Sequence, residues 1–250
     1  MKLSVITVNY NNLSGLKKTI ESVLNQTYLE FEYIIIDGGS TDGSADLIES
    51  VADRLFFWVS EKDSGIYNAM NKGVSHARGE FVVFMNSGDT FYSTSVLEQV
   101  VGSLDSDIVC GNADFGGGYI WESPSVVDEG FWLNRSFICH QSTFIRTELL
   151  KQTPYDEHYR MVADYKSFLI EFVINRRSYH KLDCIICNYD CNGLSSDDSK
   201  ADNERIQVLN ELRYNKLIEE DRLVTLCRSF KPLGRKYKLA LNLVSWINRL

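Results

Sequence analysis

Residues 31–43, Phe-Glu-Tyr-Ile-Ile-Ile-Asp-Gly-Gly-Ser-Thr-Asp-Gly, join a short apolar run to a turn-rich segment. The apolar run, residues 31–36, has the composition of a strand that is covered on both faces. Asp37 opens the glycine-rich turn, and a helix carrying Leu47, Ile48 and Val51 follows. A strand, a polar turn and a helix in this order predict one unit of a parallel sheet.

The same unit recurs on both sides of this segment. Upstream, residues 3–8 predict a strand, and residues 13–25 place their apolar side chains on one helical face. Downstream, strands are predicted at 55–59, 80–85 and 108–110 and helices at 66–77 and 94–104. Strands that alternate with helices need crossover connections, so the sheet is predicted to be mostly parallel.

The pattern is less regular beyond residue 111. A loop is predicted at 116–118, helices at 163–174 and 204–226, and a strand at 184–189. A chain of 250 residues with 44% hydrophobic composition is long enough for one well-buried domain. We therefore expect a single α/β domain with a small C-terminal appendage.

Charge and composition exclude several classes of protein. A formal net charge of −8 disfavours a nucleic-acid binder, because neutralising phosphates needs a basic face. No run of about eighteen apolar residues and no signal-peptide pattern is found, so we expect a cytoplasmic protein.

The cysteines are expected to be reduced. His180, Cys184, Cys187 and Cys191 resemble a zinc motif, but a strand would point Cys184 and Cys187 to opposite faces.

Residues 228–250 form a basic amphipathic segment on an otherwise acidic chain. They contain six cationic residues and no acidic one, interleaved with leucines, Val244, Trp246 and Ile247. One interpretation is peripheral contact with an anionic membrane surface, which the charge asymmetry favours. The other is that the apolar stripe packs on the domain and leaves the cations in solvent.

Four predicted strands end in polar turns, at residues 7–12, 37–43, 61–65 and 86–89. Ligands of an open parallel sheet bind where loops leave the carboxyl ends of the strands. The four turns are therefore expected to meet at one binding edge. A nicotinamide enzyme is disfavoured, because no G-x-G-x-x-G pattern follows the first strand.

The order and spacing of these segments resemble the family 2 glycosyltransferases of the GT-A fold. The resemblance is dense over the first ninety residues and rests on the motifs at 4–12, 21–27, 36–43, 63–73, 77–80 and 86–91, with weaker matches at 139–144 and 163–165. It implies a GT-A-like, Rossmann-related sheet flanked by helices. Residues 1–111 would be the nucleotide-binding half, residues 112–200 the acceptor-side half, and residues 201–250 a helical extension.

The resemblance also implies a nucleotide site. Tyr10 offers an aromatic face for the base, Asp37 a partner for its edge, and the backbone near Val8 supports the ring. Asp63 would contact the ribose or a nearby cation. Asp37 could instead be a turn residue capping the next helix, and Asp63 an ordinary exposed loop carboxylate.

A divalent cation, Mn²⁺ or Mg²⁺, is implied beside the diphosphate. The family usually places an acidic D-x-D at the end of the fourth strand, where this chain has Asn-Ser-Gly-Asp at 86–89. Asp89 is therefore the expected metal ligand, with Asn86 as a neutral helper. The alternative for Asp89 is a cap of the helix near Ser93.

Asp164 occupies the position of the family's catalytic base, which activates an acceptor hydroxyl on the face opposite the leaving diphosphate. It could also be a first-turn Asp favoured by the helix dipole. His140 and Gln141 are candidates for contact with the acceptor or the diphosphate, and His140 could equally be structural. Arg146 and Arg160 are further phosphate candidates.

The predicted activity is inverting transfer from a nucleotide sugar, with UDP as the expected nucleotide. The acceptor would be a hydroxyl of a saccharide or of a polyprenyl-linked saccharide, as in bacterial enzymes that build polysaccharide repeat units. Two alternatives stay open. One is a nucleotidyltransferase on a similar sheet, and the other is a non-catalytic nucleotide- or sugar-binding module, which the incomplete acidic motif allows.

Overall fold

The computed structural model describes residues 2–127, 131–132, 137–191 and 198–214 of the 250-residue chain. Within these ranges the strands form one sheet of nine, in the order β3-β2-β1-β4-β8-β6-β9-β5, with β7 paired to β6. The strands are β1 (Leu3–Asn9), β2 (Phe31–Asp37), β3 (Phe57–Ser60), β4 (Phe81–Phe84), β5 (Thr90–Phe91), β6 (Ile108–Asp114), β7 (Ile120–Trp121), β8 (Thr143–Arg146) and β9 (Tyr179–Asn188).

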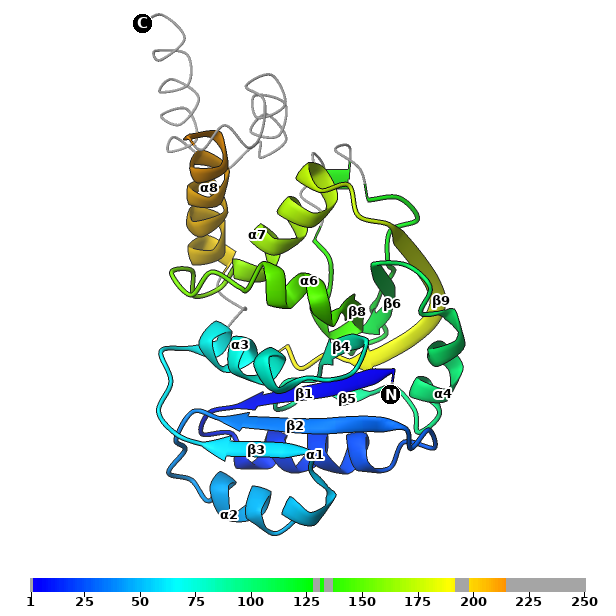
Figure 1. The fold of residues 1–250 in the computed structure, drawn as a ribbon, viewed down its shortest axis with the longest axis vertical. Helices are drawn as coiled ribbons and strands as arrows, with labels where there is room; N and C mark the ends of the chain where they lie inside the picture. Colours follow the sequence, from blue (N-terminus) through cyan, green and yellow to red (C-terminus); the bar gives the residue numbers. More distant parts are fainter. Residues whose placement is uncertain (1, 128–130, 133–136, 192–197, 215–250) are drawn as a thin grey trace, which may run out of the picture.

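The sheet is parallel in its first part and mixed in its second. β3, β2, β1 and β4 pair in parallel, as the sequence predicted. β8 then lies antiparallel between β4 and β6, and β9 runs parallel to β6 (Figure 1). β7 and β5 add antiparallel pairs with β6 and β9. The fold is therefore α/β, with antiparallel pairing concentrated in the second half of the chain.

The strand register aligns three polar side chains at one edge. Asn9, the last residue of β1, pairs with Asp37, the last residue of β2. Asp37 in turn pairs with Ser60 at the end of β3. Because parallel strands in this register end level with one another, their carboxyl ends form a common edge, as predicted for a ligand-binding sheet.

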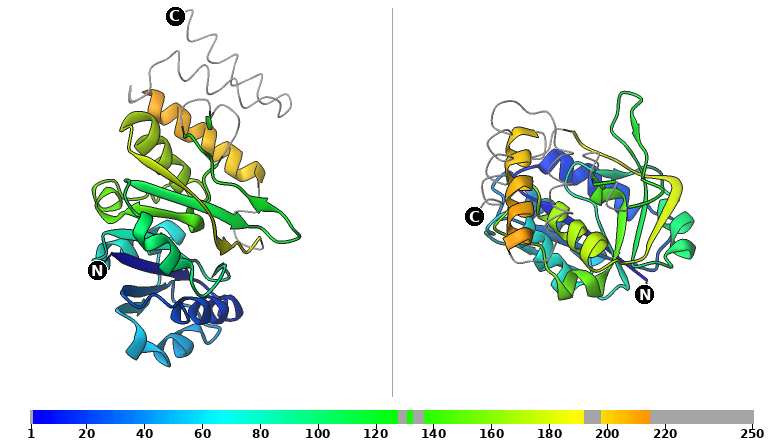
Figure 2. Two further views of the ribbon diagram at one scale, coloured as in Figure 1. Left: turned by 90° about the vertical axis from the view of Figure 1, so that its right-hand side faces the viewer. Right: turned by 90° about the horizontal axis from the view of Figure 1, so that it is seen from above.

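Helices cover both faces of the parallel part. The described helices are α1 (Leu13–Leu24), α2 (Ser44–Glu49), α3 (Ile66–His76), α4 (Val96–Val100), α6 (Thr147–Gln152), α7 (Ala163–Leu169) and α8 (Asp198–Tyr214), with short turns η1 (Ala52–Arg54), η2 (Val101–Ser103), η3 (His140–Ser142) and η4 (Ile170–Ile174). α1 packs beside α2, and α3 beside α6 (Figures 1 and 2). The chain moves along the sheet from β1 to β2 and β3, and then returns past them to β4. Because crossovers between parallel strands are right-handed, this change of direction places α3 on the face opposite α1 and α2.

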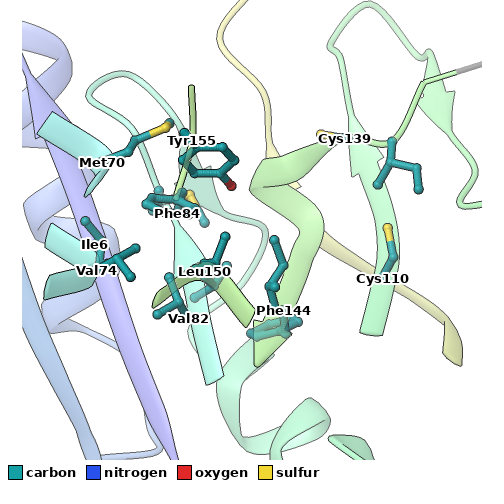
Figure 3. Close-up of a cluster of buried hydrophobic side chains, with 14 of the residues drawn as sticks. Ile6, Met70, Val74, Val82, Phe84, Cys110, Cys139, Phe144, Leu150 and Tyr155 are labelled. Atoms are coloured by element: carbon teal, nitrogen blue, oxygen red, sulfur yellow. The ribbon is translucent and has the colours of Figure 1, made fainter. Parts of the chain in front are cut away.

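The core joins the two halves of the chain. Figure 3 shows Ile6 and Phe84 of the sheet beside Met70 of α3, Leu150 of α6 and the ring of Tyr155. All five side chains are buried. Fully burying one such apolar side chain stabilises a protein by about 1.5–3 kcal/mol, so residues from both halves contribute to one hydrophobic core.

Most predicted elements of the first hundred residues are confirmed to within a few residues. The helix predicted at 94–104 is α4 followed by η2, and the helix at 163–174 is α7 followed by the π-helical turn η4. The strand predicted at 184–189 is the end of β9, which begins at Tyr179. The sequence did not predict β5, β7, β8 or α6.

The predicted C-terminal extension is only partly described. α8 begins before the predicted helix and is described to Tyr214, and it packs on α7. Residues 215–226 and the basic segment 228–250 lie outside the described residues. Within the described ranges, no helix has both the length and the apolar composition needed to cross a bilayer.

Candidate active site

A cavity of about 1560 Å³ opens where the loops leave the carboxyl ends of β1, β2, β3 and β4. Both halves of the chain line it. From the first half come Val8, Tyr10, Asp63, Asn86 and Asp89, and from the second half His140, Gln141 and Asp164. Of the site residues named from the sequence, Asp37 and Arg146 do not line this cavity, and the others do.

Tyr10 and Asp63 flank a glycine at the first-half end of the cavity. A Cβ on Gly38 would lie 2.7 Å from Asp63 Oδ2 and 3.2 Å from Cδ2 of Tyr10. No larger residue fits between them without displacing one. The Tyr10 side chain is 67% exposed, so its ring face is available for stacking. A flat aromatic face beside a carboxylate suits a base and a hydroxyl-bearing ring next to it.

Asp37 lies beneath the cavity and does not line it. Its carboxylate is fully buried and accepts hydrogen bonds from Asn9 Nδ2, Ser60 Oγ, and both the backbone N–H and Oγ of Ser40. Burial alone would raise the pKa of this carboxyl, but the four donors outweigh it and lower the pKa. Asp37 thus connects the ends of β1, β2 and β3 through hydrogen bonds. This arrangement agrees better with a structural turn residue than with direct contact to a nucleotide base.

Asp89 is a buried carboxylate in the cavity wall. Burial raises its pKa to about 6, although the backbone N–H of Asp190 donates to Oδ1 at 2.8 Å. Gly88 has a φ of +112°, and a Cβ there would lie 2.5 Å from Asp190 Oδ2. The turn before Asp89 therefore needs a glycine both for its backbone conformation and for space. Asp89 does not cap a helix, since it precedes the strand β5.

Asp190 lines the cavity beside Asp89, and sequence reasoning missed it. It follows the last strand, β9, and is 101 residues from Asp89 in the chain. The one signal in the sequence was its place just after a predicted strand end. Nothing in the sequence indicates that β9 pairs with β5, which brings the two carboxylates together.

A hydrogen-bonded series links Asn86 to Asp164 through His140. The imidazole Nδ1 lies 3.1 Å from Asp164 Oδ2, and the Asn86 amide nitrogen lies 3.2 Å from Nε2. Tyr67 donates to Asp164 Oδ1 at 2.8 Å, and the backbone N–H of Tyr165 donates to the same oxygen. The structure thus brings the predicted metal side and the predicted base side within two hydrogen bonds of each other.

The charges of this series favour an ionised Asp164. Burial would raise the pKa of Asp164, but the hydrogen bond and charge of His140, together with the Tyr67 hydroxyl, hold it below its usual value. Burial would lower the pKa of His140, and the contact with Asp164 outweighs that effect and raises it. Asp164 is therefore a carboxylate at neutral pH and can accept a proton.

The oxygen atoms around Asp89 fit a hard divalent cation. Asn86 Oδ1 is buried and has no hydrogen-bond partner, so one acceptor is left for a ligand. Asp89 and Asp190 bring two carboxylates alongside it, and oxygen donors of this kind suit Mg²⁺ and Mn²⁺. The described residues hold no group of three or more His, Cys, Asp or Glu side chains that could bind a metal. A cation here would take its other ligands from a bound phosphate.

The two arginines named from the sequence lie in different places. Arg146, in β8, pairs with Glu80 and Asp107 and does not line the cavity. Arg160 is exposed and does line the cavity, as does Arg205 of α8, which the sequence did not single out. Only Arg160 of the predicted pair can thus reach a phosphate held in the cavity.

Comparison with known proteins places the chain in a family. Residues 4–163 match the model described as "Glycosyl transferase family 2". The uncharacterized glycosyltransferase Rv1514c of Mycobacterium tuberculosis (strain ATCC 25618 / H37Rv) is 30% identical over 206 residues. That match covers 78% of this chain and 77% of the relative.

Solved structures share the fold at low sequence identity. S. aureus TarS superposes with a TM-score of 0.69 at 23% identity, covering 94% of this chain and 44% of TarS, so this chain spans less than half of that protein. TarS 1–349 in complex with UDP-GlcNAc gives a TM-score of 0.68 at 18% identity, over 98% of this chain and 72% of that one. The mannosyltransferase PcManGT from Pyrobaculum calidifontis, in complex with GDP-Man and Mn²⁺, gives 0.64 at 15% identity, over 98% and 80%.

The family model matches well over half of the chain and includes the turns that build the cavity from the first half. The predicted fold and the predicted class of enzyme are thereby confirmed. This chain belongs to glycosyl transferase family 2 and is a glycosyltransferase with a GT-A-like α/β fold.

Proposed function

We propose that this enzyme transfers a sugar, with inversion, from a UDP-sugar to a hydroxyl of a saccharide or lipid-linked saccharide in the synthesis of a cell-surface polysaccharide. One observation carries the proposal. Asp89 and Asp164 come from different halves of the chain and line the same cavity, joined through Asn86 and His140. A leaving diphosphate and an attacking hydroxyl need such groups on two sides of one sugar.

The donor would bind to the first half, residues 1–111. Tyr10 would stack on the base, Asp63 would accept from the ribose, and the chain at Val8 would support the base from below. Asp37 would act through the loops it ties together, because its carboxylate is buried and fully hydrogen-bonded. The UDP-GlcNAc complex of TarS supports the choice of a UDP-sugar.

A Mn²⁺ or Mg²⁺ ion would be held by Asp89, Asn86 and the neighbouring Asp190, and when bound it would offset the charge of the leaving diphosphate. The Mn²⁺ in the PcManGT complex supports this assignment. The buried side chain of Asp89 gives the ion a low-dielectric setting, in which its charge acts more strongly than in water.

Asp164 would be the general base. The acceptor hydroxyl oxygen would form a bond to the anomeric carbon while the bond from that carbon to the diphosphate oxygen breaks. The hydroxyl proton would pass to the Asp164 carboxylate, which the lowered pKa keeps ionised and ready to accept it. His140 and Gln141 line the same cavity and would contact the diphosphate or the acceptor.

The acceptor would bind to the second half, residues 112–200. Aromatic side chains line this part of the cavity, and Phe115 stacks on Tyr189 with ring centroids 4.5 Å apart. Aromatic faces of this kind suit the apolar face of a sugar ring. Contact of residues 228–250 with an anionic membrane would bring the enzyme to a lipid-linked acceptor, and it stays a proposal from the sequence.

The proposal is tested by following UDP release from a panel of UDP-sugars, with saccharide and polyprenyl-linked acceptors, with and without Mn²⁺. Asp164→Asn is expected to lower kcat by about 10²–10⁴-fold, because that is the usual contribution of a general base. Its affinity for UDP, measured by calorimetry, should be unchanged, since Asp164 is not among the residues proposed to contact the nucleotide.

Glu148→Gln is the matched control. Glu148 is the exposed first-turn acid of α6, as Asp164 is the first-turn acid of α7. If Asp164 served only the helix dipole, the two variants would behave alike, and the assignment would be wrong. UDP binding with no turnover on any acceptor would favour the non-catalytic module, and pyrophosphate release from UTP would favour a nucleotidyltransferase.

A further inference from the structure

Helix α3 connects the donor-side loop to the segment that carries Asp164. The helix begins at Ile66, directly after the loop that holds Asp63. Three of its side chains reach residues of the second half: Tyr67 bonds to Asp164, Asn68 to Glu157, and Asn71 to the backbone of Tyr155. The position of Asp164 therefore depends on a helix of the other half of the chain.

The bond from Tyr67 differs from the other two because it ends on Asp164 itself. The Tyr67 side chain is 5% exposed, and its hydroxyl lies 2.8 Å from Oδ1. The same oxygen accepts the backbone N–H of Tyr165, and Oδ2 lies against His140. Three donors from three separate elements thus hold the carboxylate, and Tyr67 is the one that comes from α3.

The Tyr67 ring is held in place by its neighbours. Its centroid lies 5.5 Å from that of Tyr155, whose ring lies 5.8 Å from Phe84 in the core that Figure 3 shows. A buried ring packed in this way has few alternative rotamers, so its hydroxyl is directed at one point. That point is an oxygen of Asp164.

We propose that Tyr67 is a positioning residue for glycosyl transfer: its hydroxyl orients the Asp164 carboxylate toward the acceptor hydroxyl. This inference rests on the proposed role of Asp164 as the base. Two donors on Oδ1 fix the rotation of the carboxylate, and Oδ2, which also accepts from His140, keeps one lone-pair position for the incoming proton. Tyr67 need not touch either substrate to have this effect.

Tyr67→Phe removes the hydroxyl and keeps the ring. We expect kcat to fall about 10-fold, the effect of losing one hydrogen bond to a charged group, with KM for the donor unchanged. The hydrogen bond favours the ionised carboxylate, so its loss raises the pKa of Asp164. The acid limb of the kcat–pH profile should therefore move to higher pH.

Tyr155→Phe is the matched control. The Tyr155 hydroxyl is equally buried, and it has no hydrogen-bond partner. Removing it takes away a buried polar group without breaking a bond, so kcat and the pH profile should stay as in the wild type, with an equal or higher Tm. The two variants lose the same atom from neighbouring rings and differ only in the contact with Asp164.

The outcomes separate this inference from the proposed function. If Tyr67→Phe matches Tyr155→Phe in kcat and pH profile while Asp164→Asn is inactive, Tyr67 is only structural and the inference is overturned. If Asp164→Asn keeps full turnover, the proposed function itself fails. Partial unfolding of Tyr67→Phe would lower kcat but not move the acid limb, because the position of that limb does not depend on the amount of folded enzyme.

Discussion

The two walls of the cavity are built in different ways. The first-half wall consists of turns after parallel strands, and neighbouring turns bond to one another. The backbone N–H of Asn11 donates to Ser40 Oγ, and the Asn11 side chain accepts from the backbone N–H of Thr41. Asp42 accepts from the N–H of Leu13 at the N-terminus of α1. The second-half wall follows mixed and antiparallel strands and is attached to α3 by a few side chains. The turns of the first-half wall thus support one another, whereas the second-half wall depends on its attachment to the first half.

Two buried carboxylates of the first half, Asp37 and Asp89, differ in how far their charge is offset by hydrogen-bond donors. Asp37 has four donors on its oxygens and a lowered pKa. Asp89 has fewer donors, and burial raises its pKa to about 6. A carboxylate whose charge is offset within the protein stabilises the fold, while one whose charge is offset less fully costs stability unless a cation binds beside it.

The largest expected effect is the loss of the Asp37 contacts. Asp37→Asn replaces two acceptor positions by an amide N–H that faces the donors of Ser40 and Ser60. We expect the free energy of unfolding to fall by about 4 kcal/mol, since buried donors lose a charged partner. Urea denaturation measures this change.

Asp42→Asn is the control in the same turn. Asp42 also accepts from several donors, including Leu13 and Ser44, but it is exposed. Its loss should cost about 1 kcal/mol, as for a helix cap. Equal costs at Asp37 and Asp42 would contradict the view that burial makes the difference.

The next effect is the dependence of stability on the ionisation of Asp89. Burial raises the pKa of Asp89 to about 6, above the ordinary value of 3.8 for an aspartate, so the native state holds this proton more tightly than the unfolded state. The protonated Asp89 therefore contributes to the free energy of unfolding in full below about pH 4. This contribution, about 3 kcal/mol in all, is lost as the pH rises through 6. Asp89→Asn removes this loss.

In EDTA, the Tm of Asp89→Asn should therefore exceed that of the wild type at pH 7.5 and approach it at pH 4.5. Mn²⁺ should then raise the Tm of the wild type and not that of the variant, because binding to the native state alone stabilises it. Asp53→Asn, an exposed carboxylate away from the cavity, should match the wild type throughout. If the difference in Tm between Asp89→Asn and the wild type did not change between pH 4.5 and 7.5, ionised Asp89 would not destabilise the protein.

The smallest effect concerns the attachment of the second wall. Asn71 exchanges two hydrogen bonds with the backbone of Tyr155, at 2.8 and 2.9 Å. Asn71→Ala should destabilise the protein by about 2 kcal/mol. Hydrogen exchange should become faster in residues 153–165 than in β1 and β2, since the first wall does not use this contact.

Asn68→Ala removes a contact with the exposed Glu157 and is the control for Asn71→Ala. Its effect should stay below about 0.5 kcal/mol, as for other exposed polar contacts. Uniformly faster exchange in both walls would show that the two are one cooperative unit and that the contrast between them is wrong.

The sequence predicts the first wall well because parallel strands covered on both faces leave nearly continuous apolar runs, as at residues 31–36, where Glu32 is the one charged residue. The second wall was predicted poorly for a related reason. β5 and β7 are two residues long, too short for any periodicity, and β8 is recognisable only by its pairing with β4 and β6. Antiparallel edges of this length are defined by their partners and not by their own composition.

The candidate site follows the same division. The turns that hold Tyr10, Asp63 and Asp89 could be located because each follows a predicted strand, and the resemblance supplied the roles of these three residues and of Asp164. Asp37 was assigned to the nucleotide because the sequence does not give the strand register that sets Asn9 and Ser60 against it. Tyr67 and Asp190 were missed because their roles depend on contacts across 97 and 101 residues.

The contact between Asp89 and Asp190 also has a consequence for biosynthesis. During translation, the parallel strands and their turns leave the ribosome well before Asp190 does. The second carboxylate reaches Asp89 only after β9 has joined the sheet. A nascent chain therefore contains all the turns of the first half before the cavity that both halves line can be complete.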